Sequence, residues 1–93
     1  MTVDLRVIAQ RLTSLGLTLS LAESCTGGLV SKLITDIPGS SAFYKYGIVA
    51  YSNDAKLQFL GVKPETLSAH GAVSRETAEE MAEGVRKAGS TDI

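Results

Sequence analysis

The sequence has little cysteine or histidine: one of each among its 93 residues. A lone cysteine, Cys25, excludes an internal disulfide. With His70 as the only histidine, the chain also lacks a Cys/His cluster of the kind that holds structural zinc. We therefore expect no structural metal. We expect no cofactor either.

Long apolar runs and basic runs are also missing. No apolar stretch approaches the roughly 20 residues that span a bilayer, and the N-terminus lacks the basic start and apolar core of a signal peptide. The formal net charge is -1, and an electrostatic footprint for nucleic acid or anionic lipid needs clustered Lys and Arg. These absences predict a cytoplasmic protein that binds neither membranes nor nucleic acid.

What is present is the composition of an ordinary globular chain, with 44% hydrophobic and 20% charged residues. Its length suits one small domain with a marginal core. Helical and strand patterns alternate along it. The expected elements are a helix at 5–15 closed by Gly16, a strand at 17–23, a helix from near Thr26 to before Ile37, a strand at 43–51, helices at 53–60 and from Pro64 to before His70, and a helix capped by Ser74 that ends at Gly89.

This order predicts an α/β fold. A helix that has crossed a sheet needs strands beneath its apolar face, so the pattern usually continues into another strand. In the second strand, Gly47 is expected to mark a bulge or a close approach.

The segment Glu23–Gly28 places small, polar and nucleophilic residues where a strand gives way to a helix. Backbone N–H groups in the first turn of a helix can hold a phosphate or an oxyanion, and Gly27 and Gly28 let a ligand approach the backbone. Neither GxxxxGK[ST] nor GxGxxG occurs, so a phosphate-loop or dinucleotide fold loses support. From spacing alone, a helix cap at Ser24 or Thr26 is as good an interpretation as a catalytic role.

Several short motifs, taken in order and spacing, resemble one known family. They are Leu21-Ala22-Glu23-Ser24-Cys25-Thr26-Gly27-Gly28, Pro38-Gly39-Ser40-Ser41, Tyr44 to Gly47, Tyr51-Ser52-Asn53 with Lys56, Leu60-Gly61-Val62, and His70-Gly71-Ala72-Val73-Ser74. Together they are similar to the CinA C-terminal (competence/damage-inducible) family. The resemblance covers essentially the whole chain, although each motif is weak by itself.

The resemblance implies a three-layer α/β/α sandwich and the activity of nicotinamide mononucleotide amidases. These enzymes hydrolyse the carboxamide to the acid and release ammonia without a metal. The implied partner is therefore a small pyridine nucleotide. Because a methionine stands just before the first helix, the form without a preceding molybdopterin-binding-like domain is implied.

The family's catalytic set resembles a serine, a tyrosine and a lysine at positions matching Ser24, Tyr51 and Lys56. This implies Ser24 as nucleophile, Lys56 as base and Tyr51 as relay or positioning donor. Such a lysine has to be partly desolvated or close to another cation. The alternative interpretation of Lys56 is a solvated lysine on a helix. His70, the only histidine, is interpreted as a surface or turn residue and not as the base.

Other residues of the same segments are candidates for substrate binding. Cys25 is a rival nucleophile, since a thiol at a helix N-terminus ionises readily, but it also suits a small packing residue. Glu23 is expected to accept hydrogen bonds from the ligand or to orient Lys56, or else to be a plain strand-end carboxylate. The remaining candidates are backbone contacts to an oxyanion or phosphate from Thr26, Gly27 and Gly28, and a ring contact from Tyr46.

For the tyrosines, strand alternation predicts that Tyr44 and Tyr46 share a face opposite Lys45 and Tyr51. One set is expected to line a pocket for the nicotinamide ring and the other to pack under a helix. Core packing is the alternative for Tyr44 and Tyr46.

Related domains continue through a further strand, a glycine-rich loop and later basic residues. The expectation is therefore one domain, 1–93, that supplies the N-terminal part of the sandwich and is incomplete at its C-terminus. Two hypotheses follow: a serine amidohydrolase, and a noncatalytic nucleotide-binding or protein-interaction module of the same fold. An exposed sheet edge and an uncovered helix face predict a homo-oligomer in either case.

Overall fold

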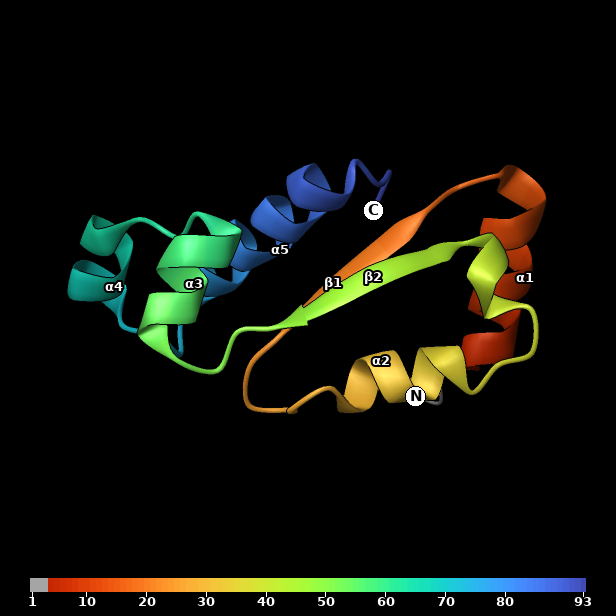
Figure 1. Cartoon of the computed structure of the whole chain (residues 1–93), viewed down its shortest axis with the longest axis horizontal. Helices are drawn as coiled ribbons and strands as arrows, with labels where there is room; N and C mark the ends of the chain where they lie inside the picture. The colour runs from red at the N-terminus through yellow and green to blue at the C-terminus, as the bar shows by residue number, and fades with distance from the viewer. Residues whose placement is uncertain (1–3) are drawn as a thin grey trace.

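A computed structural model describes residues 4–93, which form five α-helices, one 3₁₀ turn and two strands (Figure 1). In chain order they are α1 (Leu5–Leu15), β1 (Leu19–Glu23), α2 (Leu29–Thr35), η1 (Ser40–Ala42), β2 (Tyr44–Val49), α3 (Asn53–Leu60), α4 (Pro64–His70) and α5 (Arg75–Gly89). None of these helices is both long enough and apolar enough to cross a bilayer.

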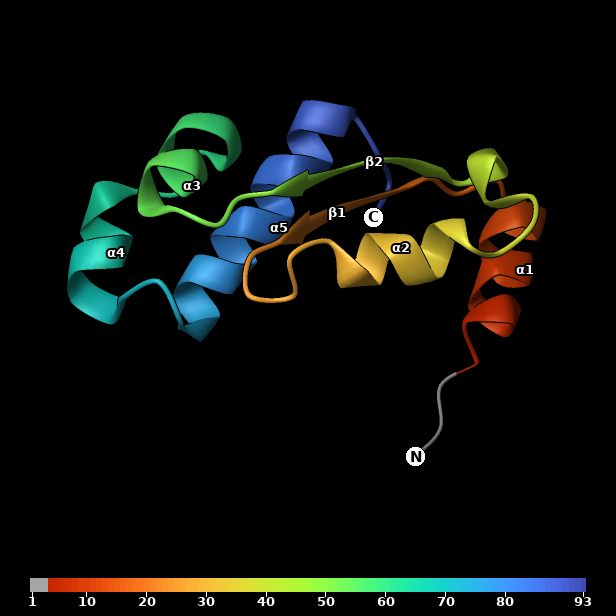
Figure 2. The ribbon, with the colours of Figure 1, turned by 60° about the horizontal axis from the view of Figure 1, so that its bottom comes forward.

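The strands β1 and β2 pair in parallel, and helices lie on both faces of the sheet. Figure 2 shows the strands passing between α5 on one side and α2 on the other. The helices α3 and α4 pack against α5. The arrangement is the expected α/β fold, with the α2, sheet and α5 layers in the order α/β/α.

Each side of the sheet has its own apolar core. The α5 side is built by the buried residues Ala50, Leu60, Val62, Met81 and Val85. The α1 and α2 side is built by Ala9, Leu12, Ile34 and Phe43. The helical spacing in the sequence reflects these contacts only in part, because Ile8 and Leu15 of α1 and Leu29 and Leu33 of α2 remain 40% or more exposed.

Helix boundaries follow the capping residues. Gly16 and Gly61 adopt the left-handed conformation that ends α1 and α3. The hydroxyls of Ser52 and Ser74 accept the N–H groups of Ala55 and Thr77 at the starts of α3 and α5. These boundaries confirm the prediction.

The start of α2 is a correction. It begins at Leu29 rather than near Thr26. Gly27 and Gly28 both have positive φ, 63° and 103°, and this backbone conformation is incompatible with a right-handed helix. Ser24 to Gly28 therefore form a turn between the strand and the helix.

The face assignment of Tyr44 and Tyr46 is also wrong. Leu19 pairs with Tyr44 and the next residue, Ser20, pairs with Tyr46, so Lys45 is an extra residue in β2. Such a bulge shifts the alternation by one position. Tyr44 consequently packs with the α1 and α2 core and Tyr46 with the α5 core.

Gly47 is a position where other groups come close to the strand, as expected. It lies one residue beyond Tyr46, which pairs with Ser20 after the bulge. A Cβ there would lie 2.6 Å from the Tyr44 hydroxyl and 2.8 Å from the Ser31 hydroxyl. A side chain at this position would force the hydroxyls of Tyr44 and Ser31 to move, so glycine allows these two side chains to approach the strand closely.

Candidate active site

The side-chain nitrogen of Lys56 lies beside the hydroxyl of Ser24. Its Nζ is 3.1 Å from Ser24 Oγ, 3.0 Å from the main-chain oxygen of Ala50 and 2.9 Å from that of Tyr51. The residue is only 2% exposed. Two residues that are 32 positions apart in the sequence are thereby brought into direct contact.

The position of Lys56 follows from the local fold. The end of β2 and the Ser52 cap start α3 next to the C-terminal end of β1. Lys56 lies one turn into α3, where its side chain points back beneath the strand ends and meets the carbonyls of Ala50 and Tyr51. Within residues 4–93 no carboxylate forms an ion pair with it.

Glu23 fastens the turn that carries Ser24. Its carboxylate accepts the Thr26 hydroxyl at 2.8 Å, the Val30 N–H at 2.8 Å, and both the N–H and the hydroxyl of Ser31 at 3.0 and 2.6 Å. Burial raises the pKa of this carboxyl, but the hydrogen bonds from Ser31, Thr26 and Val30 outweigh burial and lower the pKa to about 2. Glu23 is therefore ionised at neutral pH.

These contacts correct the expected roles of Glu23. Both carboxylate oxygens are engaged by α2 and the preceding turn, and the Nζ of Lys56 bonds to other groups. Glu23 therefore orients the Ser24 turn, not Lys56. Sequence reasoning missed this role because the donors lie three to eight residues further on, in a helix that starts later than expected.

The free backbone donors of the turn also differ from expectation. The N–H of Gly27 bonds to the Ser24 carbonyl, and those of Val30 and Ser31 are occupied by Glu23. The N–H groups of Gly27, Leu29, Val30 and Ser31 thus all have partners within the chain. Within the described chain, the N–H groups of Cys25, Thr26 and Gly28 make no hydrogen bond.

Tyr51 and Cys25 lie at the surface of the same site. The side chain of Tyr51 is exposed, at 76%, and only its main-chain oxygen contacts Lys56. Cys25 is an exposed free thiol. Lys56 thus bonds to Ser24 and not to Cys25. The tyrosine phenol makes no hydrogen bond to residues 4–93, so a relay through it is not formed in this structure.

Tyr46, a predicted substrate contact, lies elsewhere. It packs against the α5 core beside Gly89, where an added Cβ would come within 2.3 Å of its ring. The core-packing alternative describes this residue.

A cavity of about 810 Å³ opens over Ser24 and Lys56. Its floor is β1 and the following turn, from Leu19 to Thr26, and one wall is α5. The loop before α5 adds Ala72, Val73 and Ser74, while Tyr51 stands at the mouth. Ser24, Cys25, Thr26 and Lys56 therefore share one largely apolar cavity.

Comparison with known proteins decides the family. The sequence model of the family described as CinA C-terminal domain matches residues 4–93. This chain belongs to the CinA C-terminal domain family. It is 60% identical over 87 residues to a competence-damage inducible protein of Acetivibrio thermocellus and 56% identical over 86 residues to a CinA-like protein of Chloroherpeton thalassium. The two matches include 94% and 92% of this chain but only 21% and 20% of the length of those proteins.

Solved structures of CinA proteins share the fold. The competence/damage inducible protein CihA from Agrobacterium tumefaciens superposes with a TM-score of 0.91 at 45% identity, over 99% of this chain and 60% of that one. The competence or damage-inducible protein from Enterobacter asburiae gives 0.92 at 43% identity, over 95% and 55%. The chain thus spans about a fifth of the curated CinA relatives and somewhat more than half of the solved ones.

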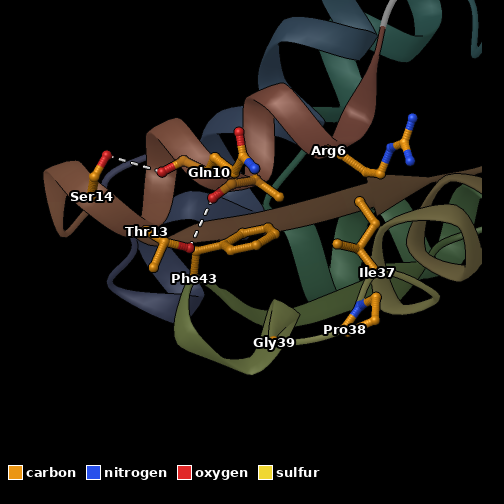
Figure 3. A pocket seen from close by; sticks show the side chains of 9 residues that line it. Arg6, Gln10, Thr13, Ser14, Ile37, Pro38, Gly39 and Phe43 are labelled. Atoms are coloured by element: carbon orange, nitrogen blue, oxygen red, sulfur yellow. Dashed lines mark hydrogen bonds between the residues drawn. The ribbon is translucent and has the colours of Figure 1, made fainter.

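A second cavity, of about 490 Å³, lies away from this CinA site, between α1 and the turn at Ile37–Gly39 (Figure 3). Its hydroxyls are engaged within the helix, since Thr13 donates to the carbonyl of Ala9 and Ser14 to that of Gln10. It contains no paired nucleophile and base, so the cavity over Ser24 is the candidate active site.

Two parts of this site were not anticipated from the CinA motifs. The carbonyl of Ala50 is a main-chain ligand of Lys56, and a backbone group leaves no signature in the residue type. The loop Ala72–Ser74 lies in one of the matching motifs, but its residue types do not indicate that it lines the cavity. The main-chain carbonyl of Gly71, just before this loop, accepts hydrogen bonds from the hydroxyls of Ser74 and Thr77.

Proposed function

We propose that the Ser24–Lys56 pair is the catalytic centre of an amidohydrolase, with the carboxamide of nicotinamide mononucleotide as substrate. The observation that carries the proposal is the contact of 3.1 Å between a buried lysine amine and a serine hydroxyl at the floor of a cavity. Amide hydrolysis needs an activated nucleophile, a proton acceptor and donors for an oxyanion.

The hydrogen bonds of Lys56 favour its role as base. A neutral amine has two N–H donors and one lone pair, and the carbonyls of Ala50 and Tyr51 can only accept. With the amine in the neutral form that a base requires, those carbonyls would take both N–H donors and leave the lone pair for the Ser24 hydroxyl, which lies 3.1 Å from Nζ. Among residues 4–93, no carboxylate forms an ion pair that would oppose the proposed role of Lys56 as base.

The proposed reaction has two halves. Ser24 Oγ attacks the carboxamide carbon while Lys56 takes the hydroxyl proton, and the oxyanion is held by free N–H groups of the turn, for which Cys25, Thr26 and Gly28 are the candidates. Lys56 returns the proton to the leaving nitrogen, the C–N bond breaks and ammonia departs. Water, deprotonated by Lys56, then cleaves the seryl ester to give the acid and restore Ser24.

The proposed substrate also fits the walls of the cavity. A planar pyridinium ring suits the apolar surface offered by Met81, Ala82 and Val73, with Tyr51 free to contact it from the mouth. The ligands of the nucleotide phosphate are not assigned to residues of this chain.

Ammonia release from nicotinamide mononucleotide tests this function. Two proteins are compared: this chain, and an extended chain in which it continues with the sequence that follows the position of Ile93 in the Agrobacterium tumefaciens relative. We expect the extended chain to release ammonia and its Ser24→Ala variant to lose at least about 10³-fold in kcat.

Cys25→Ala in the extended chain is the matched control and should keep most of the activity. Activity that survives Ser24→Ala but disappears with Cys25→Ala would assign the nucleophile to the thiol. A folded extended chain that the nucleotide stabilises against heat without release of ammonia would instead support the noncatalytic binding module.

A further inference from the structure

Three segments that are far apart in the sequence meet at the carboxyl ends of the strands. The Ser24 turn follows β1, and Tyr51 follows β2. Figure 2 shows both strands pointing to the side of the molecule where α5 begins. The loop Ala72–Ser74, which precedes α5, lines the same cavity as Ser24 and Tyr51. Ligands of open α/β sheets bind outside the carboxyl ends of the strands, so this loop is placed to contact a ligand that reaches Ser24.

Val73 is the exposed residue of this loop. It is 96% exposed, the largest value among the large apolar residues of the part of the chain that the structure describes, whereas Ala72 and Ser74 are partly buried. A single apolar side chain on an open surface is common and needs no explanation. Val73 differs from that case because it lines a cavity that also holds the paired side chains of Ser24 and Lys56.

Three hydrogen bonds hold the backbone of the loop in place. The carbonyl of Gly71 accepts the hydroxyls of Ser74 and Thr77 at 2.9 and 2.8 Å, and the hydroxyl of Ser74 accepts the N–H of Thr77 at 3.2 Å. Thr77 is fully buried, so it fixes the loop to the first turn of α5. A ligand that contacts Val73 therefore does not have to order the loop first, and little of the contact's free energy is lost to ordering.

The charges of the cavity indicate how it would recognise a ring. Among residues 4–93, Glu23 is the only carboxylate that lines it, and the carboxylate oxygens of Glu23 already accept four hydrogen bonds. A pyridinium ring would therefore meet no free counter-ion here. What remains for it is apolar contact, with Met81 and Ala82 on α5 and with Val73 on the loop.

We propose that Val73 is a specificity-determining residue, whose methyl groups contact the ring that carries the carboxamide. The identity of this ring rests on the proposed function. A contact that is equally strong in the bound substrate and in the transition state lowers KM and leaves kcat unchanged. Val73 therefore sets the affinity for the ring, whereas Ser24 and Lys56 act on the carboxamide itself.

Val73→Thr in the extended chain is the kinetic test, because threonine keeps the shape of valine and replaces one methyl group by a hydroxyl. One methyl group in an apolar contact changes an equilibrium constant about fourfold. We expect KM for nicotinamide mononucleotide to rise about fourfold or more, with kcat within about twofold. Val7→Thr, on α1 and outside the cavity, is the matched control and should change neither. An unchanged KM in Val73→Thr, with or without a fall in kcat, overturns the proposal.

A binding measurement separates this proposal from the catalytic one. The Ser24→Ala extended chain, labelled at its valine methyl groups, is titrated with nicotinamide mononucleotide and followed by NMR. We expect nuclear Overhauser contacts between the Val73 methyl groups and the ring protons. Their absence from the saturated complex overturns the role of Val73, even if the wild-type chain releases ammonia. Their presence in a protein whose wild type releases no ammonia supports Val73 and refutes the catalytic proposal, and a nucleotide that does not bind at all overturns both.

Discussion

The carboxylate of Glu23 accepts two hydrogen bonds from Ser31, one from its N–H at 3.0 Å and one from its hydroxyl at 2.6 Å. Glu23 ends β1 and Ser31 lies in the first turn of α2. The pair therefore ties the strand to the helix across the Ser24 turn. The negative carboxylate also lies at the positive end of the helix, which favours its ionised form.

This contact predicts acid sensitivity with a definite sign. The pKa of Glu23 falls from 4.5 to about 2 in the folded protein, so the unfolded chain binds the proton more tightly. The stabilisation is present above pH 4.5 and is lost as the pH falls towards 2. We expect the unfolding free energy to fall by about 2 kcal/mol over this range. This figure is smaller than the full pKa difference would give, because solvent screens charges in so small a protein.

Urea unfolding of the wild type and of Glu23→Gln, at several pH values from 2 to 6, measures this effect. The variant should be less stable by about 2 kcal/mol near pH 6, and the difference should shrink towards pH 2. Glu79→Gln is the matched control, because Glu79 forms an exposed pair with Arg75 and should cost at most about 0.5 kcal/mol. A difference between wild type and Glu23→Gln that does not vary with pH would refute the ionised contact.

Lys56→Arg separates the charge of Lys56 from its basicity. Arginine keeps donors for the carbonyls of Ala50 and Tyr51 but does not lose its proton in proteins. We expect the extended chain to lose about 10²- to 10⁴-fold in kcat for ammonia release. Lys63→Arg, at an exposed lysine before α4, should leave the rate unchanged. An active and folded Lys56→Arg variant would mean that Lys56 acts only as a cation.

Thr77→Val tests the hydrogen bond that holds the loop Ala72–Ser74, which forms part of the cavity wall. The buried hydroxyl of Thr77 donates to the carbonyl of Gly71 at 2.8 Å. Valine has nearly the same shape but no donor, so we expect a loss of about 1 kcal/mol. Amide exchange should also become faster in the loop Ala72–Ser74. Thr77→Ser retains the donor and should keep the loop protected, whereas equally fast exchange in both variants would assign the effect to packing.

The fold was readable from the sequence where the signal is local. Gly16, Ser52, Gly61 and Ser74 each act on their own turn of backbone, and the helix ends that they predict are confirmed. The bulge at Lys45 is different, because it depends on the pairing of β1 with β2, and the residue types of β2 do not encode it. It moved Tyr44 and Tyr46 to opposite sides of the sheet.

The candidate site, too, is only partly predictable from the sequence. Family resemblance indicates Ser24 and Lys56, and the structure brings their side chains together. The carbonyl of Ala50 and the donors that hold Glu23 were missed, because main-chain groups and late helix starts leave no mark on residue spacing. Spacing identified the segment that carries the site, and only the fold shows which partner each group has.

Gly84→Ala is expected to disrupt the contact between α5 and α3. Alanine normally stabilises a helix interior by up to about 1 kcal/mol relative to glycine. Here an added Cβ would lie 1.9 Å from the main-chain oxygen of Leu60 and 2.7 Å from its carbonyl carbon. Backbone atoms at the end of a packed helix cannot move aside alone, so α3, which carries Lys56, would have to shift. We expect a net loss of about 2 to 3 kcal/mol in unfolding free energy, measured in urea.

Gly89→Ala in the same helix is the graded control for this clash. Its Cβ would meet the ring of Tyr46 at 2.3 Å, and a side chain can turn where backbone cannot, so the loss should be smaller than at Gly84. Because α3 positions Lys56, Gly84→Ala should also reduce ammonia release by the extended chain more than Gly89→Ala does. A Gly84→Ala variant as stable as the wild type would show that α3 and α5 do not pack this closely in solution.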